Sequence, residues 1–241
     1  MKIALLGYGK MGKTLHKLID ENPEDRIVLM VNSANASEMT IELLEKADVA
    51  IEFSTPETAV DNIFRCFECN VPVVVGTTGW LNRFDEVKDF CIANDKAMLY
   101  AANFSLGVNL FFQLNKQLAQ IMKQWPAYDI SMEETHHTAK KDAPSGTAIH
   151  LANEVINNSN KTEWVNAAST NKEELSILSF RKDDVKGEHT INWSSEEDSI
   201  SITHSANNRL GFAKGALLAS NWIVGKKGFF SMADVLGLEF D

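Results

Sequence analysis

The stretch Lys2-Ile3-Ala4-Leu5-Leu6-Gly7-Tyr8-Gly9-Lys10-Met11-Gly12 decides the fold of the first half of this chain. It is apolar after Lys2, which predicts a buried strand, and residues 13–19 then carry apolar side chains at helical spacing. Strand, Gly-x-Gly-x-x-Gly turn and helix follow in the order of a dinucleotide-binding fold. Gly7 permits the tight turn, Gly9 lets a pyrophosphate approach the backbone, and Gly12 lets the helix pack closely on the strand. The N–H groups and the positive dipole end of the helix start are therefore predicted to bind the phosphates of a cofactor.

Alternating strand and helix patterns continue to about residue 105. Strands are predicted at residues 26–31, 49–53, 71–75 and 97–100, and helices near 38–46, 57–69 and 82–94. Such alternation implies right-handed crossovers and a parallel sheet of the Rossmann type. The loops Gly76-Thr77-Thr78-Gly79 and Ala101-Ala102-Asn103-Phe104-Ser105 follow two of these strands, so they either line the nicotinamide end of a cofactor or are simply tight turns.

The segment after the second strand bears on the choice of nucleotide. It reads Val31-Asn32-Ser33-Ala34-Asn35 and lacks the carboxylate that holds the ribose hydroxyls of NAD. Ser33 and Asn35 offer hydrogen-bond donors to a 2′-phosphate, and Lys10 offers charge. The sequence favours NADPH, with use of NADH also possible.

The pattern changes after residue 105. A helix over residues 111–118 ends before Trp125-Pro126, and strands at 128–133, 176–181, 187–193 and 199–205 surround a helix at 145–157. We expect a second, α+β domain for the substrate over residues 106–208, with a mostly antiparallel sheet. Residues 209–241, helical at 212–223, are expected to rejoin residues 1–105 in the dinucleotide-binding domain.

Composition limits the classes of partner. The chain has 241 residues and a formal net charge of -10, which argues against a nucleic-acid partner. We find no apolar run of membrane-spanning length and no signal peptide, so we expect a cytoplasmic protein without a membrane partner. Cys66, Cys69 and Cys91 lack the flanking ligands or strand of a zinc or redox motif, so we expect structural thiols.

The densest group of reactive side chains lies between Glu134 and Ala148, in the sequence ETHHTAKKDAPSGTA. His136 and His137 come at the end of a predicted strand, so their side chains point to opposite faces and only one need meet a substrate. Adjacent histidines on a strand diverge, so we expect no metal site here. Two histidines close to Lys140 favour a functional role over a structural one.

The end of this stretch predicts a binding site for a carboxylate. Pro144 suits the first turn of the following helix, which would leave the N–H groups of Ser145, Gly146 and Thr147 as donors. Lys140 adds positive charge beside them. A capped helix after a solvated loop would explain Pro144 and Ser145, but not His136, His137 and Lys140.

With these residues in view, the chain resembles the dihydrodipicolinate reductase (4-hydroxy-tetrahydrodipicolinate reductase) family of the bacterial diaminopimelate route to lysine. The resemblance spans nearly the whole chain, and the motif from His136 to Ala148 is its most selective part. The other landmarks are residues 7–12, 76–79, 101–105, 204–209, Phe212, Gly215-Ala216 and 232–237.

The resemblance implies an NADPH- or NADH-dependent oxidoreductase that reduces a cyclic, imine-like dicarboxylate to tetrahydrodipicolinate. It implies that His136 and Lys140 are the catalytic acid–base pair and that His137, Gly146 and Thr147 bind a substrate carboxylate. It further implies cofactor contacts along Gly7–Gly12, at Gly76, Thr77 and Thr78, and at Ala101, Ala102, Asn103 and Phe104. Family members are typically homotetramers assembled through the sheet of the second domain, which would make residues 106–208 an oligomerisation domain too.

Two rival functions fit parts of the sequence. A homoserine or aspartate-semialdehyde dehydrogenase shares the glycine loop, but the latter needs a nucleophilic cysteine, and Cys91 lies in a helical pattern without catalytic neighbours. A nucleotide-sensing protein would need no acid–base residues, so His136, His137 and Lys140 argue against it.

Overall fold

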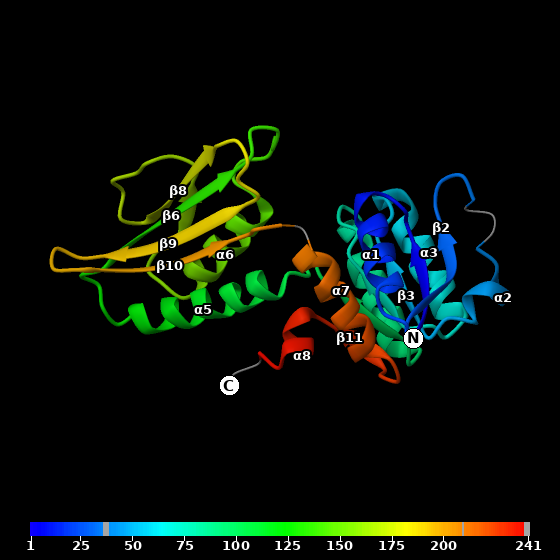
Figure 1. Cartoon of the computed structure of the whole chain (residues 1–241). Coiled ribbons are helices and arrows are strands. Elements are labelled where there is room, and N and C mark those ends of the chain that lie inside the picture. The colour runs from blue at the N-terminus through cyan, green and yellow to red at the C-terminus, as the bar shows by residue number, and fades with distance from the viewer. Residues whose placement is uncertain (36–38, 209, 239–241) are drawn as a thin grey trace. The chain divides into compact units, whose positions relative to one another are not determined.

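The computed structural model describes residues 1–35, 39–208 and 210–238. The chain divides into two compact units, one formed by Met1–Leu106 with Leu210–Asp241 and the other by Gly107–Arg209. Each unit has its own sheet (Figure 1). Residue 209, where we expected a domain boundary, and residue 38, the expected start of a helix, lie outside the described residues. Among the residues that are described, no helix is long and apolar enough to cross a membrane.

The first unit is built on a six-stranded sheet in the order β11-β5-β4-β3-β1-β2, in which all neighbouring strands run parallel. Its strands are β1 (Lys2–Leu6), β2 (Arg26–Val31), β3 (Val49–Glu52), β4 (Val73–Val75), β5 (Ala97–Tyr100) and β11 (Gly228–Phe230). The chain moves outward from β1 to β2 on one side and from β3 to β5 on the other. The strand order therefore reverses between β1 and β3, and the carboxyl ends of these strands form the expected ligand edge.

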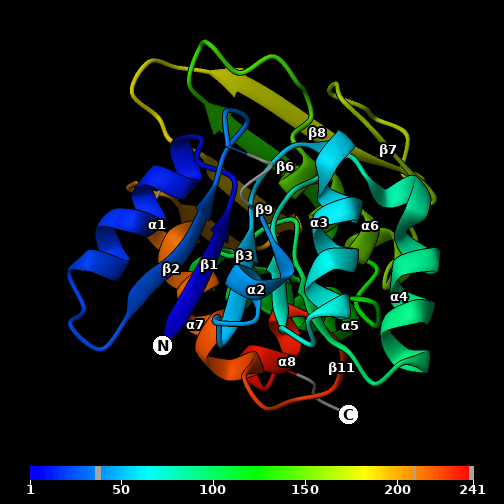
Figure 2. The ribbon, with the colours of Figure 1, turned by 90° about the vertical axis from the view of Figure 1, so that its right-hand side faces the viewer.

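Helices cover both faces of this sheet (Figure 2). On one face, α2 (Ile41–Leu44), α3 (Pro56–Glu68) and α4 (Phe84–Ala93) bury apolar side chains against Leu6 and Val73. On the other, α1 (Lys10–Asp20) and α7 (Leu210–Ile223) pack with Leu5 and Val74, and Met232 of α8 (Met232–Leu236) joins the same core. Successive strand residues face opposite sides, so two covered faces require the continuous apolar strands that the sequence shows. The Rossmann-type fold predicted from the glycine loop is confirmed.

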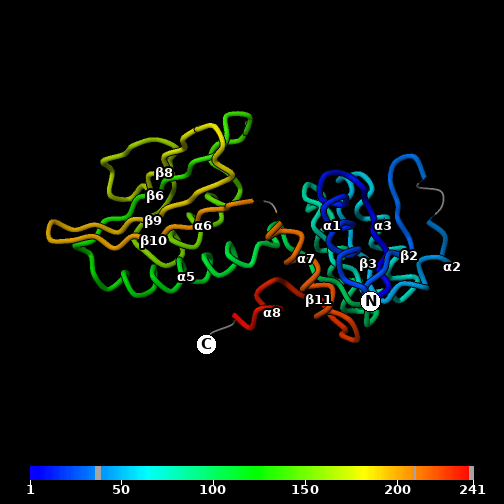
Figure 3. The backbone as a smooth tube through the Cα atoms, viewed as in Figure 1, coloured from blue at the N-terminus to red at the C-terminus, as the bar shows by residue number. Residues whose placement is uncertain are grey.

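The second unit is built on a five-stranded sheet in the order β10-β9-β6-β8-β7. Its strands are β6 (Asp129–His136), β7 (Glu163–Val165), β8 (Glu174–Arg181), β9 (Glu188–Ser194) and β10 (Ser199–Ser205). The two longer ladders, β10–β9 and β9–β6, are antiparallel, whereas β6–β8 and β8–β7 are parallel. Figure 3 traces the long β9–β10 hairpin. The expected mostly antiparallel sheet is confirmed, with a parallel part that the sequence did not predict.

Two helices, α5 (Leu106–Met122) and α6 (Gly146–Asn157), form the core of the second unit with one face of its sheet. Phe111 and Leu151 are buried in one cluster with Met132, Ile177 and Ile191 of the central strands. The side chains of β6 alternate between buried and exposed or half-buried positions along the strand. The opposite face of β6 therefore remains outside this core.

Some boundaries differ from those that the sequence predicted. The helix expected at residues 38–46 is only the single turn Ile41–Leu44, and the one expected at 82–94 begins as a 3-10 turn, Leu81–Arg83. Strand β6 continues from the predicted residues 128–133 into the histidine motif and ends at His136, because its ladder with β8 continues to the pair His136 and Arg181. The extension places Glu134 and His136 on the core-facing side of a regular strand.

Candidate functional site

The glycine loop of the first unit has the tight geometry that the sequence predicted. Gly7 has φ +103°, and a Cβ built there would lie 2.1 Å from the carbonyl oxygen of Phe53. A Cβ on Gly12 would lie 2.2 Å from the carbonyl oxygen of Gly7. A Cβ on Gly9 would meet no atom within 4 Å among the residues described. Gly7 and Gly12 thus close the turn, and Gly9 leaves the start of α1 open to a ligand.

Phe53 joins the three loops that were predicted to bind the cofactor. Its backbone lies against Gly7, and its ring would touch a Cβ on Gly76 at 2.2 Å. The same ring packs against that of Phe104, with the ring centroids 5.6 Å apart. The loops at residues 7–12, 76–79 and 101–105 are therefore neighbours at one sheet edge.

The predicted cofactor residues differ in exposure. Gly9, Lys10, Thr78 and Ala102 are exposed, and Tyr8, Met11, Gly76, Ala101 and Asn103 are half-buried. Thr77 and Phe104 are buried, and the hydroxyl oxygen of Thr77 accepts a 2.8 Å hydrogen bond from the backbone N–H of Ser54. Thr77 and Phe104 therefore support the loops at this edge from within the protein, while the exposed residues can contact a ligand from solvent.

A buried carboxylate, Glu52, was missed in the sequence analysis. It ends β3 and is fully buried, and it accepts hydrogen bonds from Ser54 and from the side-chain amide of Asn62. Burial raises the pKa of Glu52, while hydrogen bonds from Ser54, Thr77 and Asn62 oppose that shift. The acidic residue at the end of an apolar strand was the available signal. Glu52 ties the loop after β3 to the loop after β4.

The turn after β2 uses its two asparagines to fold itself. The side-chain oxygen of Asn35 accepts the backbone N–H of Asn32 at 2.7 Å, and its amide donates to the carbonyl of Met30 at 2.9 Å. One N–H of the Asn35 amide is therefore used within the turn, and its contact with a 2′-phosphate stays a prediction. Ser33 is exposed in this turn.

In the second unit, a row of polar side chains crosses the sheet at one level. Glu134 of β6 lies directly opposite Ser179 of β8 and His189 of β9, and His189 lies opposite His204 of β10. Residues in register on neighbouring strands face the same side. This row therefore continues the core-facing side of the sheet, where the apolar residues Ile130 and Met132 precede Glu134 on β6.

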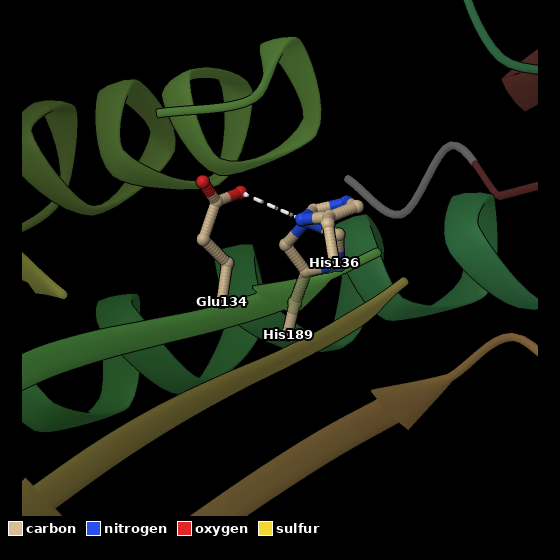
Figure 4. A group of neighbouring side chains, drawn as sticks. All are labelled: Glu134, His136 and His189. Carbon is tan, nitrogen blue, oxygen red and sulfur yellow. Dashed lines mark ion pairs between the residues drawn. The ribbon is translucent and has the colours of Figure 1, made fainter. Parts of the chain in front are cut away.

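Glu134 is the centre of this row, and Figure 4 shows its carboxylate with His136 and His189 on one side of the sheet. It accepts a 2.8 Å hydrogen bond from the Ser179 hydroxyl and bonds of 3.1 and 3.2 Å from the backbone N–H of Ser145. Its Oε2 lies 3.5 Å from Nδ1 of His136 and 3.6 Å from Nε2 of His189.

These contacts and burial shift the pKa of the Glu134 carboxyl group and the pKa of the His136 ring. Burial raises the pKa of Glu134, but interactions with His189, Ser145, Ser179 and His136 outweigh it and lower that pKa to about 2. Burial lowers the pKa of His136 to about 4, and nearby Glu134 only partly opposes this. In this state, a neutral His136 therefore lies beside an ionised Glu134 at pH 7. The ring differs from an ordinary exposed histidine in this respect because it is buried.

Lys140 and Asp142 form an ion pair on the loop between β6 and α6, with Nζ 2.8 and 2.9 Å from the two carboxylate oxygens. Arg181 of β8 holds the same loop, donating to the carbonyl of Lys140 at 3.2 Å and to that of Asp142 at 2.6 Å. The nearest guanidinium nitrogen of Arg181 is 4.0 Å from Glu134. His137, which follows His136 at the end of β6, is half-buried, and its carbonyl accepts a 3.1 Å hydrogen bond from the backbone N–H of Lys140.

The start of α6 differs from the prediction. The helix begins at Gly146 with Ser145 as its N-cap, so Pro144 precedes the cap instead of occupying the first turn. The backbone N–H of Ser145 is bonded to Glu134 and is not the open donor that we expected. The Ser145 hydroxyl accepts the N–H of Ala148 and lies 3.1 Å from Nε2 of His189. Gly146 is exposed, and a Cβ there would meet nothing within 4 Å in the part of the chain described.

Glu134, His136 and His189 also have ligand atoms within 4.8 Å of one another, a spacing that a metal ion can use. No metal site was expected at His136 and His137, but the structure brings together a different group, in which His136 meets Glu134 and His189. The cationic side chains of Arg181 and Lys140 act electrostatically on this group, and the positive end of α6 begins beside it. These positive charges favour an internally paired carboxylate over a bound cation.

The three cysteines are buried free thiols in the first unit, as the sequence predicted. Burial raises the pKa of Cys91 to about 11. A thiol of that kind is not a nucleophile, which removes the structural basis for an aspartate-semialdehyde type of enzyme.

The Rossmann-type parallel sheet and the separate α+β unit have the architecture of a two-unit, nucleotide-dependent oxidoreductase. The family model "Dihydrodipicolinate reductase, N-terminus" matches residues 1–104, and "Dihydrodipicolinate reductase, C-terminus" matches residues 107–236. The chain belongs to the dihydrodipicolinate reductase family.

Relatives and solved structures agree with this membership. The chain is 42% identical over 236 residues to the 4-hydroxy-tetrahydrodipicolinate reductase of Christiangramia forsetii, with 98% of each chain covered. It is 33% identical to that of Methanoregula boonei, with 99% of this chain and 98% of the relative covered. The fold is similar to a dipicolinate-bound dihydrodipicolinate reductase from Paenisporosarcina sp. TG-14, with a TM-score of 0.78, 22% identity, and 97% and 98% of the two chains covered.

Proposed function

We propose that this protein reduces 4-hydroxy-tetrahydrodipicolinate to tetrahydrodipicolinate with a nicotinamide nucleotide, a step of diaminopimelate and lysine biosynthesis. The observation that carries the proposal is that both halves of the chain match the two parts of one reductase family. The 42% identity extends over 98% of the chain, so both units are included in the likeness.

The first unit is proposed to hold NADPH, with NADH as an alternative. The open position at Gly9 and the start of α1 suit the pyrophosphate, and Ser33 lies where a 2′-phosphate would meet no acidic side chain from residues 31–35. Thr78, Ala101, Ala102 and Asn103 are proposed to line the nicotinamide end. Tyr8, Lys10 and Met11 would flank the phosphates, and Gly76, Thr77 and Phe104 would shape the loops beneath.

The second unit is proposed to hold the dicarboxylate. The N–H groups of Gly146 and Thr147 at the start of α6 would bind one carboxylate, assisted by His137 and by the charge of Lys140. Ser145 supports this site as the cap of the helix, since its own N–H is bonded to Glu134.

His136 and Lys140 are proposed as the acid–base pair. When bound, the nucleotide supplies a hydride, and since the 4-hydroxyl of the substrate leaves as water, the balance requires one added proton. His136 is neutral at pH 7 in the structure because its pKa is lowered to about 4. A dianion bound beside it would raise that pKa and let His136 take up the proton that it then delivers. Lys140 must leave Asp142 to reach the substrate.

We propose a homotetramer in the cytoplasm, assembled through the sheet of the second unit. The exposed face of that sheet, where Phe180 is 47% exposed, supports such an assembly.

The test is direct. The purified protein is mixed with the aldol product of pyruvate and aspartate semialdehyde, and oxidation of NADPH and NADH is followed by absorbance. Oxidation that depends on both substrate and protein is expected, faster with NADPH. Absence of oxidation with either nucleotide would overturn the proposal and favour a nucleotide sensor.

A further inference from the structure

The carboxylate of Glu134 has no role in the function proposed above, although it touches the groups proposed to act there. Its side chain is fully buried, and it contacts β8 through Ser179, β9 through His189 and the start of α6 through Ser145. A buried carboxylate is costly unless its partners compensate it. The arrangement therefore calls for an explanation beyond packing.

We propose that Glu134 is a positioning residue that holds His136 with Nδ1 toward the carboxylate, so that Nε2 exchanges the proton with the substrate. The same carboxylate fixes the start of α6 by binding the N–H of Ser145. One side chain thereby sets the geometry of both the proton donor and the carboxylate site. This inference rests on the proposed function for its catalytic meaning, but its structural content can be tested without turnover.

The orientation of the His136 ring follows from its two neighbours. Nδ1 is buried, and within the described part of the chain it has no hydrogen-bond partner, while the Oε2 atom of Glu134 is 3.5 Å away. On the other side, Nε2 would lie 3.3 Å from a Cβ at Gly187, so glycine leaves room there. Gly187 has φ +149°, a conformation that side chains disfavour. Nε2 therefore faces residue 187, where the lack of a side chain leaves space beside the ring.

The hydrogen bonds of Glu134 leave one oxygen for the histidines. Oε1 accepts from the Ser179 hydroxyl and from the Ser145 N–H, whereas Oε2 accepts a longer bond from Ser145 and faces His136 and His189. An ionised oxygen beside Nδ1 stabilises a proton on that nitrogen. The neutral ring then carries its lone pair on Nε2, and a proton taken up on Nε2 is the one that can be passed on.

The titratable and charged groups facing His136 come from four elements. They are Glu134 on the same strand, His189 on β9, Arg181 on β8 and Lys140 on the following loop. Glu134 is the only one of these four that favours the protonated ring; the other three disfavour it. Removing its charge should lower the pKa of His136 further and also leave the tautomer less defined.

The decisive measurement needs no variant of Glu134. In protein labelled with 15N-histidine, NMR at pH 7 reports the tautomer of each ring, with His136 assigned by comparison with His136→Asn. The inference predicts the Nδ1–H tautomer for His136. Finding the Nε2–H tautomer would overturn it, whether or not the protein reduces the proposed substrate.

Glu134→Gln then tests the consequence, because glutamine keeps the shape and one acceptor oxygen but loses the charge. We expect kcat to fall by roughly 10–100-fold, the size of a disturbed acid–base step, with the affinity for NADPH unchanged. The histidine-dependent limb of the kcat profile should move to lower pH, and Glu134→Asp should partly restore it. The matched control is Glu173→Gln, an exposed glutamate of the same unit, which should leave all these quantities unchanged.

The outcomes separate the two proposals. Loss of turnover in Glu134→Gln with an unmoved pH profile and an unchanged His136 tautomer would show a merely structural carboxylate and overturn this inference. Should Glu134→Gln fail to fold, the tautomer and the pKa of His136 in the unaltered protein still decide it. Failure of the proposed function, in contrast, would appear as absent turnover in the unaltered protein.

Discussion

The ammonium group of Lys140 is held by the carboxylate of Asp142, two residues further along the same loop, at 2.8 Å. Asp142 is exposed, and the hydrogen bond that it accepts from Lys140 lowers the pKa of its carboxyl group. Exposed ion pairs of this kind are weak, typically worth about 0–1 kcal/mol. A substrate carboxylate can therefore compete with Asp142 for Lys140 at little cost.

Replacing Lys140 or His136 by alanine should remove the acid–base contribution. We expect kcat to fall at least ~10²-fold in each variant, with the fold retained as judged by circular dichroism. Lys141→Ala is the matched control, since Lys141 is the exposed neighbour of Lys140 and has no proposed role. Near-normal steady-state turnover in both Lys140→Ala and His136→Ala would refute the assignment.

Binding of a dicarboxylate should be linked to proton uptake by His136. Burial lowers the pKa of this ring to about 4, so the ring is neutral at pH 7 before binding. A bound dianion raises that pKa, so a proton enters with the ligand, and affinity should increase as the pH is lowered from 8 to 6. Dipicolinate, the ligand of the Paenisporosarcina structure, is a suitable probe.

Calorimetry of dipicolinate binding at pH 7 in buffers of different ionisation enthalpy measures this uptake. The apparent enthalpy should vary with the buffer in the unaltered protein and vary less in His136→Gln. Equal apparent enthalpies in all buffers would mean that no proton is taken up, and His136 would then not be the group that charges on binding.

The first unit was predictable because its signals are local. The apolar strands, the glycine spacing and the helix between them lie within about thirty residues, which is the span of one βαβ unit. The predicted loops at Gly76 and Phe104 do meet at one edge of the sheet. Their joining residue, Phe53, was missed because its contacts depend on how three separate strands align.

Only part of the polar row of the second unit could be predicted from the sequence. Ile130, Met132, Glu134 and His136 alternate with half-buried or exposed residues, and this alternation along the strand that leads to the histidines was the available signal for Glu134. Ser179 and His189 were not predictable in this way. Their places beside Glu134 follow from the register of β8 and β9, which depends on distant segments of the chain.

The nucleotide preference should respond to charge at Ser33. This residue is exposed in the turn after β2, where a 2′-phosphate is proposed to lie. Ser33→Asp places a negative charge there, and we expect kcat/KM for NADPH to fall by about tenfold or more through repulsion, with a smaller change for NADH. Ser33→Ala is the control and should change the ratio little. An unchanged NADPH to NADH ratio in Ser33→Asp would place the 2′-phosphate elsewhere.

Two glycines of the first loop should separate nucleotide binding from folding. A Cβ at Gly9 meets nothing within 4 Å in the described residues, and its φ of -74° is outside the left-handed region that favours glycine. Gly9→Ala should therefore unfold at nearly the normal temperature but bind NADPH about tenfold more weakly or worse, because the methyl group occupies the path of the pyrophosphate.

At Gly12, a Cβ would lie 2.2 Å from the carbonyl oxygen of Gly7. Gly12→Ala should lower the free energy of unfolding by roughly 1–3 kcal/mol, as overpacking does. Thermal unfolding and NADPH fluorescence titration measure the two effects, and normal NADPH affinity in a well-folded Gly9→Ala protein would show that the nucleotide does not approach this turn.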